Sequence, residues 1–243
     1  MLSNFLFVAR KSARNSFPNI HVRNFPDRKT RSRRRKKAYV MWSGGLDSTA
    51  LVWHYLQRQY DVAAGYVAFP ANVGKTAAEL RAIHRMLPFL EQYRFKFKGV
   101  VGWFRWNYGI KDNLHRGPFA IVNILYSAML EEKFDEMSFG LVRDDNVSKI
   151  EAKAFDGIYR AMHPLLLTRN RLTYPLRYRS KKQLLSTLPP ELRQHLWTCD
   201  QVSARQRRPC GKCARCRRYQ ELFRELENES NRRGKKPRAE ARR

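Results

Sequence analysis

A seven-residue string near the start of the chain combines glycines with hydroxyl and carboxylate side chains. It reads Ser-Gly-Gly-Leu-Asp-Ser-Thr, occupies residues 43–49 and follows a short apolar run at 39–42. Glycines let a backbone turn tightly and approach a ligand closely. A helix that starts after such a turn presents unpaired N–H groups and the positive end of its dipole, and both favour phosphate oxygens. The string therefore predicts a phosphate-binding loop, whereas a bare Gly-Gly turn would indicate only a capped helix.

We expect a phosphate-bearing cofactor to contact the whole turn and the first helical turns. Hydroxyl groups at 43, 48 and 49 are hydrogen-bond donors for phosphate. Asp47 would repel phosphate unless it faces a cation, so it is predicted to bind Mg²⁺ or the backbone of the loop. The predicted cofactor-binding residues are Trp42, Ser43, Gly44, Gly45, Leu46, Asp47, Ser48, Thr49, Ala50, Leu51 and Val52.

A nearby Gly74-Lys75-Thr76 string resembles the end of a Walker phosphate loop. The first glycine of that motif would fall at position 69, which holds Phe69, so the match fails. Lys75 is close enough to the second predicted strand to lie near a nucleotide, but we expect it to be a solvated residue at a helix start.

All four cysteines of the chain lie between positions 199 and 216, as Cys199, Cys210, Cys213 and Cys216. Four thiolates can hold one zinc ion tetrahedrally, and cysteines three residues apart in a turn can reach the same ion. The C-x2-C-x2-C run is also compatible with an iron–sulfur cluster, and two disulfides are a third alternative. We expect one zinc ion, which is structural because four cysteines leave no open coordination position.

Alternating patterns between 38 and 175 predict the elements that carry these residues. Strands are expected at 39–42, 62–69, 95–103 and 136–142. Helices are expected at 46–60, 76–90, 119–132 and 148–162. Such alternation is typical of βαβ units, so the fold class is α/β, with a doubly wound, mainly parallel sheet and a C-terminal zinc-knuckle segment.

The charge distribution divides the rest of the chain. Of a net charge of +28, residues 1–37 carry +11 and residues 231–243 carry +6. We expect four parts: a disordered basic arm at 1–37, an ATP-binding α/β domain at 38–175, a small helical segment with the cysteine site at 176–228, and a basic tail at 229–243. The arm is either an organelle transit peptide or a nucleic-acid-binding arm. No apolar run approaches the length that crosses a bilayer, so we expect a cytoplasmic protein without a membrane partner, the transit peptide being the open alternative.

Together, the loop and the cysteine segment resemble 7-cyano-7-deazaguanine synthase, a family of the PP-loop ATP pyrophosphatase superfamily. The loop at 43–49 resembles the pyrophosphate-binding loop of that superfamily, and residues 197–199 with 209–216 resemble the family's zinc segment. The stretch Tyr174-Pro175-Leu176, followed by Lys181, resembles the family's segment ahead of a helix with an early lysine. The resemblance covers about residues 38–220 in order and spacing, and it is strongest at the two ends.

This resemblance implies a ligase that uses ATP, Mg²⁺ and one structural Zn²⁺. Such an enzyme adenylates the carboxylate of 7-carboxy-7-deazaguanine and uses ammonia to form 7-cyano-7-deazaguanine. The implied catalytic residues are Asp47, Lys181 and Arg116. The chain departs from the family's pattern at 69–72 and 116–118, two segments that would border the nucleotide or the substrate. The identity of the acceptor therefore stays open.

Two other functions remain in view. One is a related adenylating enzyme that acts on RNA or on a protein, which the basic arms favour. The other is a zinc-bearing nucleic-acid binder without activity, which the intact loop at 43–49 disfavours. The expected partners are thus a small-molecule substrate and, through the arms, nucleic acid. The oligomeric state is open, with a homodimer among the alternatives.

Overall fold

The structure is a computed structural model that describes residues 34–68, 73–103, 134–145, 148–165, 170–200, 202 and 206–234. Contacts within the chain separate residues 1–34 from residues 35–243, and the second unit contains the sheet, the helices and both cavities. The helix expected at 119–132 lies outside the described residues, as do Arg116 and the segment 69–72. No helix in the described part of the chain is both long and apolar enough to pass through a membrane.

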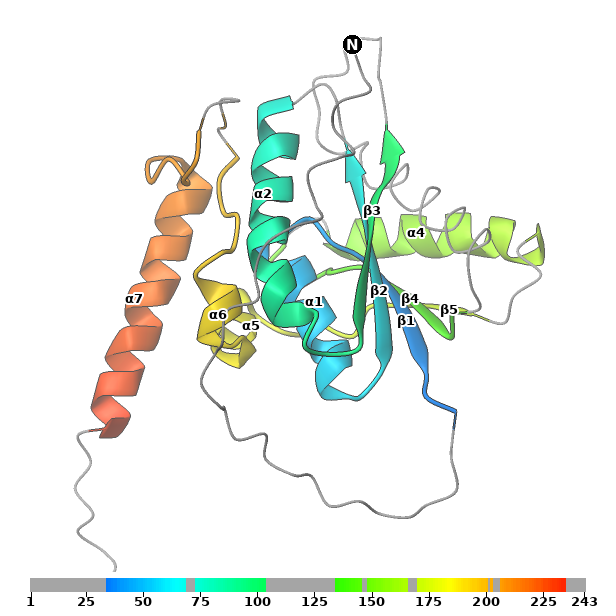
Figure 1. The fold of residues 1–243 in the computed structure, drawn as a ribbon, viewed down its shortest axis with the longest axis horizontal. Coiled ribbons are helices and arrows are strands. Elements are labelled where there is room, and N and C mark those ends of the chain that lie inside the picture. The colour runs from blue at the N-terminus through cyan, green and yellow to red at the C-terminus, as the bar shows by residue number, and fades with distance from the viewer. Residues whose placement is uncertain are drawn as a thin grey trace, which may run out of the picture. The chain divides into compact units, whose positions relative to one another are not determined.

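Five parallel strands form one sheet in the order β3-β2-β1-β4-β5 (Figure 1). The strands, in chain order, are β1 (Lys37–Met41), β2 (Asp61–Ala68), β3 (Phe95–Trp103), β4 (Glu136–Ser138) and β5 (Arg171–Thr173). β1 lies at the centre, paired on one side with β2 and on the other with β4. The sheet therefore grows outward from β1 in both directions, and its direction of growth reverses between β1 and β4.

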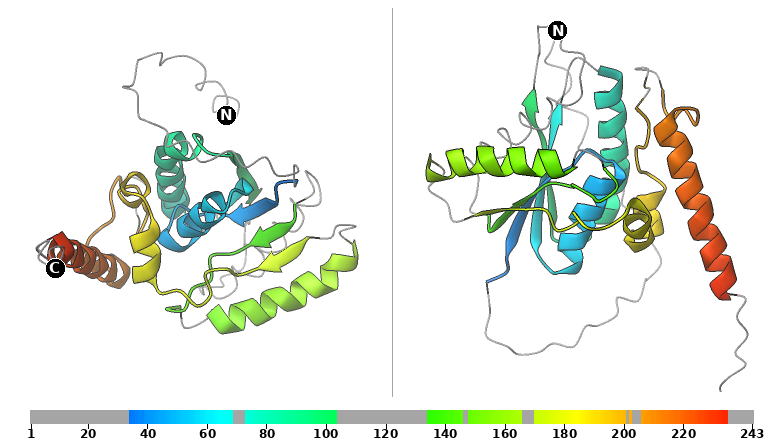
Figure 2. Two further views of the ribbon diagram at one scale, coloured as in Figure 1. Left: turned by 90° about the horizontal axis from the view of Figure 1, so that it is seen from below. Right: turned by 180° about the vertical axis from the view of Figure 1, so that it is seen from behind.

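Helices cover both faces of the sheet. The helices of the described residues are α1 (Leu46–Gln57), α2 (Val73–Leu90), α4 (Ser148–Met162), α5 (Lys181–Thr187), α6 (Pro190–Arg193) and α7 (Ala214–Gly234), with a short 3₁₀ turn η3 (His163–Leu165) after α4. Figure 2 shows α4 on one face of the sheet and α1 with α2 on the other. The α/β class and the doubly wound parallel sheet predicted from the sequence are confirmed.

The side chains of β1 alternate between the two faces, as a buried strand requires. Ala38 and Val40 belong to the larger apolar cluster, on the side of α1 and α2, whereas Tyr39 belongs to the smaller cluster, on the side of α4. Both clusters exclude water from β1 almost completely. The central strand is thus buried on both faces, which is the reason that its sequence is a continuous apolar run.

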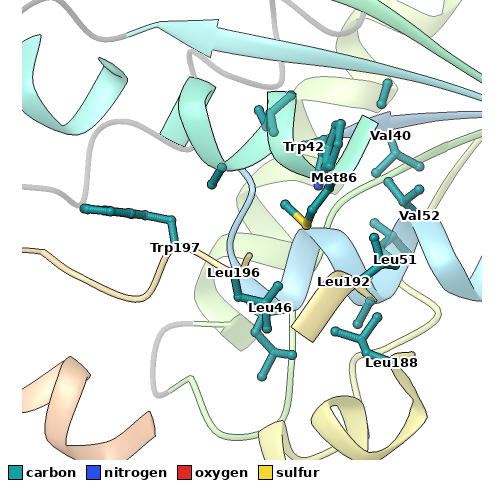
Figure 3. Packing of buried hydrophobic residues seen from close by; sticks show 14 of the residues in the cluster. Val40, Trp42, Leu46, Leu51, Val52, Met86, Leu188, Leu192, Leu196 and Trp197 are labelled. Carbon is teal, nitrogen blue, oxygen red and sulfur yellow. The ribbon is translucent and has the colours of Figure 1, made fainter. Parts of the chain in front are cut away.

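Short elements near the C-terminus extend the larger cluster. Leu188, Leu192 and Leu196 are buried, and Figure 3 shows them beside α1 and its Leu46 and Leu51. These three leucines, before, within and after α6, therefore belong to the same core as α1. This packing brings the first cysteine, Cys199, to the end of α1 that carries the predicted phosphate loop.

β4 is shorter than the strand expected at 136–142, since it ends at Ser138. Its neighbour β5 has only three residues, so the ladder of hydrogen bonds ends there. Beyond it, Gly140 passes directly beneath the start of α1. A Cβ atom on Gly140 would lie 2.8 Å from the carbonyl carbon of Asp47 and 2.9 Å from the backbone nitrogen of Ser48. At this position only a glycine fits against the helix start.

We predict that Gly140→Ala lowers the free energy of unfolding by about 1–3 kcal/mol, because the new methyl group must displace backbone atoms. Urea unfolding without nucleotide measures the change. Gly157→Ala is the matched control. A Cβ on Gly157 meets nothing within 4 Å, and the residue lies inside α4, so this change should stabilise the protein by about 0.5–1 kcal/mol. Equal stability of the two variants would show that Gly140 is not pressed against α1.

Candidate functional site

A cavity of about 340 Å³ opens where β1, β2 and β4 end. Its walls include Met41 from the end of β1, Tyr66 and Val67 from β2, and Phe139 and Gly140 after β4. Ligands of open parallel sheets bind at the carboxyl ends of the strands, at the point where the order of the strands reverses. In this sheet that point lies between β1 and β4, so the cavity is where the topology favours a ligand site.

The loop between β1 and α1 forms one wall of the cavity and is held by its glycines. Gly44 has a φ of +72°, and a Cβ there would lie 3.1 Å from the carbonyl oxygen of Glu79 in α2. Gly45 caps α1 without a side-chain hydrogen bond and lines the cavity. The first N–H groups of a helix have no partner within the helix. At α1 the cap supplies none from a side chain, which leaves these groups available to an anion in the cavity.

Hydroxyl groups brace this loop from within. The backbone N–H of Ser43 donates to Ser48 Oγ over 3.1 Å, and the two serine hydroxyls lie 3.1 Å apart. Beneath them, the indole N–H of Trp42 donates to Thr49 Oγ1 over 2.9 Å. Ser43 and Ser48 line the cavity, whereas Thr49 is fully buried. The loop is therefore shaped by its own side chains before any ligand arrives.

Two carboxylates and one lysine meet on the other side of the loop. Lys181 Nζ lies 2.7 Å from Asp145 Oδ1 and 3.7 Å from Asp47 Oδ2. The lysine starts α5, whose Ser180 and Gln183 form a capping box, and its backbone N–H donates to Asp144. These contacts hold the amine beside the cavity, which it lines together with Asp47.

The carboxyl group of Asp47 lies in a setting that disfavours its charge. Burial raises the pKa of Asp47 to about 6, against the opposing effect of the Lys181 amine, and the negative charge of Asp145 raises it further. Its Oδ1 atom is buried and has no hydrogen-bond partner among the described residues. A buried carboxylate oxygen without a partner is an unfavourable arrangement that a bound cation would correct.

Further side chains line the cavity that the sequence motifs did not assign to it, among them Lys75, Arg215 and Tyr219. Lys75 lies 3.7 Å from Asp200, and Arg215 lies 2.7 Å from the same carboxylate. Arg215 and Tyr219 are one turn apart on α7, so they share a face of that helix. With Lys181, these residues bring three cationic groups to the cavity, each paired with a carboxylate, and Asp47 and Glu79 line the same wall.

The predicted cofactor-binding residues separate into two groups in the structure. Six of them line the cavity: Trp42, Ser43, Gly45, Leu46, Asp47 and Ser48. The other five are buried and support the loop from below or behind: Gly44, Thr49, Ala50, Leu51 and Val52. Lys181 lies in the cavity wall as expected from the sequence. Lys75 was expected to be solvated and is instead only partly exposed, at the cavity.

The four cysteines converge, although they span 18 positions of sequence. Their sulfur atoms all lie within 4.8 Å of one another, and Cys210 Sγ is 3.9 Å from Cys216 Sγ. No disulfide joins them. One tetrahedral zinc ion with Zn–S bonds of about 2.3 Å places its sulfur atoms about 3.8 Å apart. The cluster thus has the size of a site for one metal ion.

Backbone N–H groups point at these sulfur atoms. The N–H of Cys213 donates to Cys210 Sγ and that of Cys216 to Cys213 Sγ, each over 3.4 Å. Burial opposes ionisation of Cys213, but N–H donors including those of Asp200 and Cys216 outweigh it and lower its pKa to about 6. Burial raises the pKa of Cys216. Four thiolates at this spacing need a cation to offset their charge, and the donor set fits a metal that prefers sulfur.

The cysteine cluster and the loop are physically joined. The backbone N–H of Trp197 donates to the carbonyl oxygen of Gly44 over 2.9 Å. Two residues later, Cys199 contributes a sulfur to the cluster and also lines the cavity. Cys216 lies in the first turn of α7, next to Arg215, so the cluster is also attached to that helix. A metal ion at the cysteines would therefore fix both the segment that closes the loop and the helix that carries Arg215.

Comparisons with known proteins add little to this geometry. No protein-family model and no curated protein matches the chain. Among solved structures, it is similar to one described as "The crystal structure of predicted subunit of tRNA methyltransferase from Methanocaldococcus jannaschii DSM". The identity is 16%, the match covers 61% of this chain and 72% of that chain, and the TM-score is 0.39. A likeness of this extent carries no argument about function, which must come from the site itself.

Proposed function

We propose that the chain is an ATP-splitting enzyme of the PP-loop type that activates a carboxylate by adenylation. The observation that carries the proposal is the glycine turn at the start of α1, which borders a cavity at the topological switch point and has Asp47 and Lys181 beside it. The turn supplies unpaired N–H groups, and the cavity is rimmed by cationic side chains. Together these features suit the triphosphate of a nucleotide.

Mg²⁺ is the cation that best fits the carboxylates of this site. Asp47 offers a buried oxygen without a partner, and Asp145 lies across the same lysine. Hard oxygen ligands are the ones that Mg²⁺ prefers, and the ion usually completes its shell with phosphate oxygens and water. When bound, it would neutralise charge that develops on the departing pyrophosphate. Asp47 is the residue assigned to hold it.

The side chains of this chain have separate tasks in the proposed reaction. The N–H groups at the start of α1 and the hydroxyls of Ser43 and Ser48 bind phosphate oxygens. Lys181 stabilises negative charge on the phosphates, because it lies beside the loop and is itself largely buried. An acceptor carboxylate oxygen then attacks the α-phosphorus, the bond to the β-phosphate breaks, and pyrophosphate leaves. The product is an acyl-adenylate, and the enzyme's contribution is positioning and electrostatic stabilisation.

For the acceptor we propose 7-carboxy-7-deazaguanine, with ammonia as the second substrate. Ammonia displaces AMP from the acyl-adenylate and gives an amide, and a second activation removes water to give the nitrile. The support for this choice is the pairing of the loop at 43–49 with the cysteine spacing, as in 7-cyano-7-deazaguanine synthase. Substrate-facing segments of that family correspond to 69–72 and 116–118, outside the described residues. Because the sequence departs from the family's pattern in both segments, RNA or a protein is the alternative acceptor.

The metal at the cysteines is proposed to be one structural zinc ion. The mutual distances of the sulfur atoms suit a single tetrahedral ion, whereas an iron–sulfur cluster holds its cysteines around several irons and needs a wider arrangement. All four ligands come from the chain, so the ion would leave no position for substrate. Its role would be to hold Trp197 against the loop and to set the direction of α7.

The first prediction from this proposal concerns the products. Purified chain with 7-carboxy-7-deazaguanine, ammonium and Mg-ATP should release AMP and pyrophosphate, measured by chromatography and a coupled pyrophosphate assay. Asp47→Asn should reduce the rate by about 10²-fold or more, since the cation ligand is lost. The same variant should unfold at an equal or higher temperature than the parent at pH 8 without ligands, because it removes a buried charge.

The raised pKa of Asp47 determines in which direction the stability of the ligand-free protein changes with pH. The pKa of this group is higher in the folded chain than its ordinary value of 3.8, so folding binds a proton there between about pH 4 and pH 6. Its contribution to stability is therefore lost as pH rises through that window, and Asp47→Asn should remove this loss.

AMP release only when RNA or a protein is added would select the alternative acceptor. If ATP were not split with any acceptor, the proposal that the chain is an ATP-splitting enzyme would be refuted.

A second prediction compares two adjacent lysines. Lys181→Met should lower kcat/KM for ATP by about 10²–10³-fold, because the largely buried amine beside the loop is lost. Lys182→Met is the control: this lysine pairs with Glu225 and Glu229 on α7, and the change should alter kcat/KM by no more than about 3-fold. Similar losses in both variants would mean that Lys181 acts only through the packing of α5.

A third prediction concerns the metal. Elemental analysis should find one zinc ion per chain, and Cys213→Ala should abolish metal binding and lead to unfolding or aggregation. Removal of zinc by a chelator should also weaken ATP binding measured by calorimetry, since the N–H of Trp197 would no longer be held against Gly44. A brown protein that contains iron would show that the cysteines hold an iron–sulfur cluster and not zinc. Unchanged ATP affinity after metal removal would show that the cysteine cluster does not support the loop.

A further inference from the structure

A second cavity, of about 250 Å³, lies between α2 and the segment that carries the cysteines. Arg81 and Arg85 line it from α2, and Arg207 and Arg208 line it from the loop before Cys210. His195 and Trp197 complete the polar and aromatic part of the wall. No aspartate or glutamate is among the residues that line it. This arginine pocket has no task in the proposed splitting of ATP.

The four arginines have no acidic partner among the described residues. Arg81 donates to the backbone carbonyl of Gln206 over 2.7 Å, which joins α2 to the loop and leaves the guanidinium charge uncompensated. Arg85, Arg207 and Arg208 are exposed, and none of them forms an ion pair with a residue in the described part of the chain. Elsewhere in the described chain, basic residues such as Lys181, Lys182 and Arg215 are paired with carboxylates. The pocket is thus a concentrated site of unpaired positive charge.

His195 shows the effect of that charge. Burial lowers its pKa, and the nearby Arg85 guanidinium lowers it further. The imidazole lies in the same wall as the arginines and offers a hydrogen bond and a flat surface. Trp197 supplies a second aromatic surface, and its backbone N–H contacts the phosphate loop at Gly44. The two cavities therefore share Trp197 as a common wall.

We propose that this pocket binds a single-stranded segment of RNA, with phosphates on the arginines and a nucleotide entering beside His195 and Trp197. Guanidinium groups bind phosphate oxygens in a planar fork and also stack on bases, which ammonium groups do not. A concave pocket with aromatic walls suits an unstacked nucleotide, whereas duplex DNA is read by an element that enters a groove. RNA bound at this place would lie next to the ATP cavity, although binding does not depend on ATP splitting.

The test measures binding of a 20-nucleotide, fluorescein-labelled single-stranded RNA to the full chain by anisotropy, without nucleotide. The triple variant Arg85→Ala/Arg207→Ala/Arg208→Ala should weaken binding by at least 10-fold. It should also reduce the slope of log K against log salt concentration by about 2, at about 0.7 per phosphate contact for single strands. All three side chains are exposed, so the fold should persist, and an unchanged zinc content and unfolding temperature would verify it.

The control variant is Lys153→Ala/Arg160→Ala/Arg171→Ala. It removes the same charge from exposed residues of α4 and β5, away from the pocket, and should change the affinity by less than 3-fold. Equal losses in the two triple variants would overturn the proposal, because net charge alone would then explain binding. Unchanged RNA affinity in the pocket variant would also overturn it, and so would tighter binding of a duplex DNA of the same sequence that depends on the same three arginines.

Discussion

The carbonyl oxygen of Gly44 is the point on which the candidate site depends. It belongs to a turn that must expose its N–H groups to a cavity while its other backbone groups are buried between two helices. Buried backbone groups need hydrogen-bond partners, and for this carbonyl the partner is the N–H of Trp197, 153 positions later in the chain. A loop that looks local in sequence is thus completed by the cysteine segment.

That dependence gives the cysteine cluster a role in the site without a role in chemistry. The segment 196–199 runs from a leucine packed on α1, through Trp197 at the loop, to Cys199 at the cluster. If a metal ion draws the four sulfur atoms together, it tightens the same segment against the loop. The cluster also determines where α7 begins, and therefore where Arg215 and Tyr219 meet the cavity. Binding energy of the metal would in this way contribute to the order of the site.

The electrostatics of the cavity are unfavourable in isolation and are expected to improve with a ligand. Asp47 is held in a setting that raises its pKa, and one of its oxygens has no partner among the described residues. Lys75, Lys181 and Arg215 bring positive charge to the same wall, and each is paired with a carboxylate. A buried ionisable group with a shifted pKa in a cavity is typical of functional sites. The arginine pocket behind Trp197 is more strongly positive, because no carboxylate of the described residues lines it.

The sequence alone determined the class of the fold and the two motifs, because both depend on short-range patterns. Strand and helix periods predicted an α/β sheet, a glycine turn before a helix predicted the loop, and cysteine spacing predicted a metal site. The ends of the strands were predicted less well from the sequence. β4 proved shorter than expected and β5 was not foreseen, since the length of a strand depends on how far its neighbour can pair with it.

Only the tertiary structure decided which charged residues belong to each cavity. Lys75 and Arg215 lie on two helices far apart in sequence, and no local pattern distinguishes them from the other basic residues, whereas Lys181 was expected at the site only from the family resemblance. Nor does the sequence indicate that Arg81 and Arg207 line one pocket, which results from the packing of the cysteine segment against α2. Charges gather at a site through long-range contacts, whereas periodicity and spacing report only on neighbours along the chain.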